Sequence, residues 1–89
     1  MFFVSLIKFR HRLTKADINK TGEIIRSNPK VKVQGMYWTF GRFDAVMIAE
    51  APDEKTYMAF ATQFGDYVST ESLLAIPREE ALKAVGLAS

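Results

Sequence analysis

Two carboxylates lie at the two ends of one apolar segment, and they are the first candidates for chemistry in this chain. Asp44 precedes the apolar run 45–49, and Glu50 follows it. A carboxylate that is partly removed from water holds a proton more readily and can act as a general base. The alternative is that Glu50 is exposed at a strand end or paired with Lys8 across neighbouring strands. Glu50 and Asp44 are therefore candidate acid–base residues.

The four residues Gly41-Arg42-Phe43-Asp44 fit either a turn or the mouth of a pocket. Glycine adopts backbone angles that other residues avoid, and aspartate accepts hydrogen bonds from nearby backbone amides. In the structural interpretation, Asp44 bonds to such amides or pairs with Arg42. In the functional interpretation, Arg42 and Asp44 bind a polar group of a ligand.

The chain has one histidine and no cysteine, which excludes thiolate chemistry and cysteine-ligated metal sites. His11 lies in a basic stretch, so we interpret it as a solvated loop residue rather than a haem ligand or a proton carrier. No second ligand lies at the spacing of a metal site, and no phosphate-binding glycine loop is present. We therefore expect no metal and no other cofactor.

Hydroxyl and aromatic side chains on the expected strands supply the other candidates for a ligand site. Tyr37 and Trp38 are adjacent, so their side chains must point to opposite faces of a sheet. One is expected to pack under a helix, and the other to line an interface or a cavity. Hydrogen bonds to a ligand are expected from Ser5, Tyr37 or Thr70. The candidate ligand-binding residues are thus Ser5, Tyr37, Trp38, Arg42, Asp44, Glu50 and Thr70.

Basic residues are concentrated in the first half of the chain, although the net charge is only +2. Residues 1–45 carry nine Lys or Arg and three Asp or Glu, whereas residues 46–89 carry three and seven. Folding brings the two halves together and largely compensates these charges. An RNA-binding sheet would also need stacking aromatics on its central strands, and the segment 45–49 has none. We therefore expect no nucleic-acid partner.

The caps and turn residues predict the order strand, helix, strand, strand, helix, strand, short helix. Thr14 and Asp17 form a capping-box pair, and Asp53 is the N-cap of the second helix. Gly65 is expected to end the second helix in the left-handed conformation, and Gly86 is expected to end the third helix. The expected strands span residues 2–9, 31–40, 43–51 and 68–76, and the expected helices span 15–27, about 53–65 and 78–85, the last with docked Leu82 and Val85.

This order predicts an α+β fold of the ferredoxin-like βαββαβ type with a short C-terminal helix. Its four-stranded antiparallel sheet carries both main helices on one face. Residues 1–89 are expected to form a single domain, with a radius of gyration of about 12 Å if it is compact. The pattern does not tell which face of the strands meets the helices.

The expected strands are apolar on both faces. Residues 2–9, 36–51 and 68–76 do not alternate cleanly between apolar and polar, and 48% of the chain is hydrophobic. Such a sheet must be buried on both sides, yet the helices cover only one. A domain of this size buries only about 60–65% of its surface on folding, which leaves apolar area for association. We therefore expect a sheet-to-sheet homodimer or a higher homo-oligomer.

The chain offers no segment for a membrane. No apolar run reaches the roughly 18–20 residues that cross a bilayer. The apolar start at residues 1–7 lacks a basic leader and a cleavage site, so we interpret it as a strand. With the absence of cysteine, this favours a cytoplasmic protein.

One stretch resembles the GYD domain family, namely Thr39-Phe40-Gly41-Arg42-Phe43-Asp44 and the following residues 45–53. The opening FFVSLIKF and residues 70–75 are similar to the first and last strands of that family. The family is named for a Gly-Tyr-Asp signature, and Phe43 stands here in place of the tyrosine. The resemblance implies a dimeric α/β barrel, and it implies no common activity.

Three functions are compatible with these features. The first is a homo-oligomeric small-molecule-binding or regulatory module, with an apolar ligand between sheet and helices or at the dimer seam. The second is a small cofactor-independent enzyme of the isomerase or oxygenase type, acting on an aromatic or enolisable compound through Glu50 or Asp44. The third is a structural assembly partner. The residues alone do not decide whether the protein is an enzyme.

Overall fold

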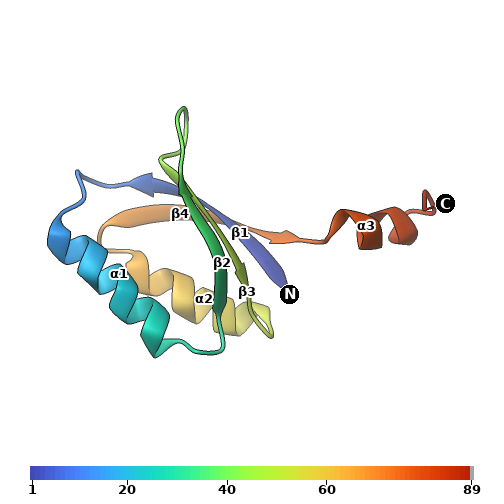
Figure 1. The fold of residues 1–89 in the computed structure, drawn as a ribbon, viewed down its shortest axis with the longest axis horizontal. Coiled ribbons are helices and arrows are strands. Elements are labelled where there is room, and N and C mark those ends of the chain that lie inside the picture. The colour runs from blue at the N-terminus through green and yellow to red at the C-terminus, as the bar shows by residue number, and fades with distance from the viewer. Residues whose placement is uncertain (89) are drawn as a thin grey trace.

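A computed structural model describes residues 1–88 of the chain (Figure 1). The strands and helices follow one another as β1 (Phe2–Phe9), α1 (Lys15–Ser27), β2 (Lys32–Trp38), β3 (Ala45–Glu50), α2 (Glu54–Ala61), the 3-10 turn η1 (Thr62–Phe64), β4 (Val68–Ala75) and α3 (Arg78–Ala84). The strands form one sheet in the order β2-β3-β1-β4, and each neighbouring pair is antiparallel. The expected α+β, ferredoxin-like fold is confirmed.

One face of the sheet packs against α1 and α2, which lie on the same side of it in Figure 1. The buried residues of β1 are Phe3, Ser5 and Ile7, and their partners across β3 are Ala49, Met47 and Ala45. This alternate set of side chains therefore faces the helices, which answers the question that the sequence left open.

The other face of the sheet has no helix over it in the described residues. Val4 and Leu6 of β1 lie opposite Ile48 and Val46 of β3 on this face, and all four are only partly buried. Leu73 on β4, which pairs with Val4, is 46% exposed. We call this surface the open face. The two central strands, β3 and β1, are apolar on this face, and Glu71 of the edge strand β4 lies on it beside Leu6.

Local signals in the sequence account for the two main helices. Thr14 Oγ1 accepts from Asp17 N at 3.2 Å, and Asp17 Oδ2 accepts from Thr14 N at 3.0 Å, which is the expected capping box of α1. Asp53 Oδ1 accepts from Thr56 N at 2.7 Å and caps α2. The inward stripe of α2 and η1 is buried and comprises Tyr57, Phe60 and Phe64, with Ala61 partly buried.

Two expectations for the C-terminal part are wrong. Gly65 follows η1 with φ −60°, an ordinary right-handed angle, because the chain tightens into a 3-10 turn before it leaves the helix. Helix α3 buries no residue, and Val85 is 66% exposed, because α3 continues away from the body of the domain (Figure 1). This extension raises the radius of gyration to 14.5 Å. Gly86 does end α3 with a positive φ of 76°.

Across residues 1–88, the helices are too short or too polar to span a lipid bilayer.

The capping box of α1 generates a test of the fold. Thr14→Ala removes the side-chain acceptor of the Asp17 amide, so the free energy of unfolding should fall by about 1 kcal/mol. Thr14→Ser keeps the hydroxyl and is the matched control. Urea unfolding followed by circular dichroism measures both variants, and equal stability of the two would show that the box contributes nothing.

Candidate ligand-binding cavity

A cavity of about 70 Å³ lies between the helix-facing side of the sheet and the helices. Its wall is mainly apolar and consists of Ile7, Phe9, Leu13, Ile18, Met36, Trp38, Ala45, Met47, Ala61, Phe64 and Val68. Residues with a side-chain hydroxyl complete the wall: Ser5, Thr21, Tyr37, Tyr67 and Thr70. The cavity exists because the sheet has small residues at this point, notably Ser5 and Ala45.

Ser5 links the cavity wall to two further hydroxyls, that of Tyr57 in the core and that of Ser72 on β4. Ser5 Oγ lies 2.5 Å from Tyr57 Oη and 2.7 Å from Ser72 Oγ. The Tyr57 ring stacks on Phe3 with centroids 4.2 Å apart. Burial raises the pKa of the Tyr57 phenol, and the hydrogen bonds with Ser5 and Ser72 offset part of that rise. The network fixes the side chain of Ser5, which is itself completely buried.

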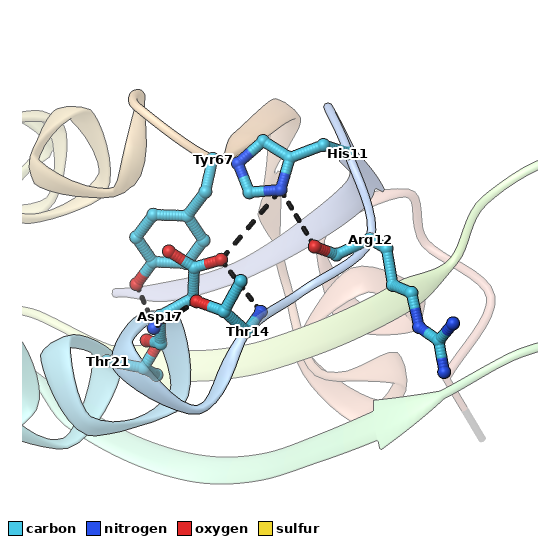
Figure 2. Close-up of polar contacts among 6 residues, drawn as sticks. All are labelled: His11, Arg12, Thr14, Asp17, Thr21 and Tyr67. Atoms are coloured by element: carbon cyan, nitrogen blue, oxygen red, sulfur yellow. Dashed lines mark hydrogen bonds and ion pairs between the residues drawn. The ribbon is translucent and has the colours of Figure 1, made fainter.

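A second hydroxyl pair joins α1 to the segment before β4 (Figure 2). Tyr67 Oη lies 2.5 Å from Thr21 Oγ1, and Thr21 Oγ1 also donates to the Asp17 carbonyl at 2.9 Å. Lys20 lies over the Tyr67 ring with its Nζ 5.9 Å from the centroid. Tyr67 is therefore held in place from both its ring and its hydroxyl.

Four of the expected site residues are part of this cavity wall, namely Ser5, Tyr37, Trp38 and Thr70. Trp38 packs edge-on against Phe9, with ring centroids 5.2 Å apart. The Tyr37 ring lies on the opposite face of the sheet over Gly35, where an added Cβ would come within 2.7 Å of it. The two aromatics thus point to opposite faces, as the alternation of a strand requires.

Arg42 and Asp44 lie in the β2–β3 connection, outside the cavity wall. This connection spans residues 39–44 and is longer than the two-residue turn that we expected, with Gly41 at φ 108°. Asp44 Oδ2 accepts from Phe9 N at 2.8 Å, and Asp44 N donates to the Ile7 carbonyl at 2.8 Å. Asp44 therefore fastens the start of β3 to β1.

Glu50 lies at the opposite end of β3 from Asp44. It faces a shallow surface hollow that it shares with Lys30 and Lys32. The suggested pairing of Glu50 with Lys8 is wrong, because Glu50 pairs with Phe2 in the register, at the other end of β1 from Lys8. Lys8 Nζ instead donates to the Arg42 carbonyl at 3.1 Å. The two candidate carboxylates therefore do not share a site.

His11 lies in the exposed loop before α1 (Figure 2). Its Nδ1 lies 2.9 Å from the Arg12 carbonyl and 3.9 Å from Asp17 Oδ2. A carbonyl oxygen only accepts hydrogen bonds, so Nδ1 is the donor. The ring is absent from the residues that line the cavity.

Sequence reasoning missed Thr21 and Tyr67. A signal for Thr21 was available, because helical spacing puts it on the same side of α1 as Ile18 and Ile25. Tyr67 follows Gly65 and Asp66 in the short connection before β4. Its contact with Thr21 spans 46 positions, and no local pattern indicates such a pairing.

The buried phenol of Tyr57 gives a pH-dependent test. The folded state holds the Tyr57 proton more tightly than the unfolded state, so this contribution to stability is complete below about pH 10 and is lost as the pH rises further. Tyr57→Phe should lower the free energy of unfolding by about 1 kcal/mol at neutral pH, since it breaks the bond to Ser5. The same substitution should also make the free energy of unfolding fall less steeply as the pH rises above about 10.

Urea titrations from neutral to strongly alkaline pH measure both effects. The exposed Tyr37→Phe is the control and should follow the unmodified protein. An unchanged alkaline slope in Tyr57→Phe would show that Tyr57 is not the group responsible.

The comparison with protein families gives one match. The family model of the GYD domain matches residues 10–85 of the 89-residue chain. The matched span begins directly after β1 and includes Thr21, Tyr67 and Thr70, whereas Ser5 lies before it. No curated protein matches the chain. Because the match covers most of its length and confirms the resemblance seen in the sequence, the chain belongs to the GYD domain family.

Proposed function

We propose that the protein is a homo-oligomeric module that binds a small molecule, with the ligand held between the sheet and α1. The observation that carries this proposal is the cavity with an apolar wall and a few fixed hydroxyls. Ligand sites in proteins have this character, a largely apolar wall with a small number of placed polar groups. The hydrogen bonds of Ser5 and Tyr67 pre-organise two of those groups.

Binding fits the cavity better than acid–base catalysis does. Among the residues that line it in the described part of the chain, none is a carboxylate or a histidine. One carboxylate oxygen of Asp44 already accepts a hydrogen bond from the Phe9 amide, and Glu50 lies at the far end of β3. A ligand in the cavity would therefore meet hydroxyls and apolar groups, which hold and orient a molecule without moving its protons.

The oligomer of this proposal forms through the open face. Its two central strands are apolar, while Lys8 lies at one end of the face, Lys32 and Glu50 lie at the other, and Glu71 lies on the edge strand β4. An apolar centre with a charged rim is typical of a protein interface. A standard interface removes about 800 Å² per partner, worth on the order of 20 kcal/mol before costs. Association costs about 4–15 kcal/mol or more, so a net gain is expected.

A pair of alanine substitutions on α2 tests the binding site. Ala61 lines the cavity, whereas Ala59 is exposed on the same helix. Ala61→Leu adds three carbon atoms to the cavity wall and should exclude the ligand, while Ala59→Leu adds the same atoms outside it. Native mass spectrometry of each protein, purified from its natural host, measures the bound mass.

We expect bound small molecule with the unmodified chain and with Ala59→Leu, and none with Ala61→Leu. Thermal unfolding checks that both variants fold. Equal bound mass in both variants would place the ligand elsewhere. No bound mass in any of the three proteins would contradict the proposal and would favour a structural assembly partner.

A further inference from the structure

The hydrogen bonds around Thr21 fix the direction of the contact between Tyr67 and Thr21. A threonine hydroxyl has a single proton, and a carbonyl can only accept. Thr21 Oγ1 gives its proton to the Asp17 carbonyl at 2.9 Å. The second contact of the same oxygen, at 2.5 Å from Tyr67 Oη, therefore has Tyr67 as its donor. The phenol proton of Tyr67 is therefore used in the hydrogen bond to Thr21 and is not free for a ligand.

Tyr67 and its partner Thr21 both line the cavity, and what Tyr67 Oη can still offer a ligand there is a hydrogen-bond acceptor. Its oxygen has lone pairs in addition to the O–H that it donates. Among residues 1–88 the phenol oxygen Tyr67 Oη makes no hydrogen bond other than the one to Thr21. The residue is only 3% exposed, so bulk water has little access to it. A buried acceptor of this kind favours a ligand that brings a donor.

The rest of the wall excludes charge. None of the residues that line the cavity in the described chain is an acid, a base or a histidine. An ion transferred into such surroundings without a partner of opposite charge loses its hydration at a large free-energy cost. The ligand must therefore be uncharged.

We infer that the ligand is a small uncharged hydroxy compound, an alcohol or a phenol, whose O–H donates to Tyr67 Oη while its apolar part lies against Ala45, Met47 and Phe64. The inference rests on the proposed binding function. It adds that the ligand donates, and Tyr67 accepts, the hydrogen bond between them. A molecule of the same shape that can only accept would place two acceptors against each other at Tyr67 Oη.

The size of the cavity limits the ligand to about one ring. Its volume of about 70 Å³ is smaller than the roughly 150 Å³ of a cavity that accepts benzene. A single ring therefore requires the rim to move. Trp38 and Ile18 form part of the wall and are 69% and 50% exposed, so their side chains can change rotamer at little cost.

Phenol, toluene and anisole are suitable probes. Phenol can donate a hydrogen bond, anisole can only accept one, and toluene can neither donate nor accept. Titration into the full-length protein, followed by NMR chemical shifts, gives the three dissociation constants. We expect phenol to bind more tightly than toluene, and Tyr67→Phe to reduce that preference by about threefold to tenfold, the value of one neutral hydrogen bond. Thr62→Val, which removes a hydroxyl outside the cavity, is the control.

Thr21→Val provides a second, opposite prediction. It removes the acceptor of the Tyr67 proton, so Tyr67 can then donate to a ligand, and the affinity for anisole relative to phenol should rise by a similar factor. Thr62→Val is the matched control, because Thr62 Oγ1 donates to the Met58 carbonyl at the same 2.9 Å distance outside the cavity.

The outcomes separate the inference from the function on which it rests. If phenol and toluene bind equally and neither Tyr67→Phe nor Thr21→Val changes the ratios, the inference is wrong while the binding site stands. If none of the three probes shifts the resonances of the cavity residues, the proposed binding function falls together with it.

Discussion

The structure depends on one constraint: the strands are apolar on both sides, and the two main helices reach only one of them. The helix-facing set of β1 and β3 is buried almost completely, with Phe3, Met47 and Ala49 among its members. The opposite set, centred on Leu6, Val46 and Ile48, is only half-buried. Helix α3 does not relieve this imbalance, because it leaves the body of the domain after β4. The dimer that we propose follows from this single imbalance.

The same helix layer explains why the cavity lies where it does. Helix α2 and η1 bring the aromatic rings of Tyr57, Phe60 and Phe64, which pack edge to face or tilted against one another and fill their half of the core. Helix α1 has no aromatic residue, and only Ile24 of it is buried. Small residues of the sheet therefore face a helix that cannot fill the space above them. Close packing in one half and a void in the other result from the composition of the two helices.

Local chemistry made much of the fold predictable. The bounds of β1 and α1 agree with the expected 2–9 and 15–27, because the capping box of Thr14 and the proline at position 29 mark the helix ends. The two strands of the hairpin were predicted to be longer than they are. The connection 39–44 replaces the expected two-residue turn, and it is closed by the hydrogen bond from Thr39 N to the Asp44 carbonyl. Helix α3 was expected to dock from its apolar spacing, but spacing does not say whether a surface is within reach.

The candidate site was predictable only where the strands determine it. Ser5, Trp38 and Thr70 belong to the cavity wall because strand alternation and sheet order bring them together. Thr21 and Tyr67 meet only through tertiary packing, so no local pattern could join them. Asp44 and Glu50 looked like a pair because both flank one apolar run, yet a strand of that length holds its two ends far apart.

Sedimentation equilibrium of the purified full-length chain at micromolar concentration tests the central claim most directly. The account predicts a homodimer or a larger even-numbered assembly, because the open face needs a second copy to cover it. A folded monomer that stays soluble across that concentration range, with native circular dichroism, would contradict it.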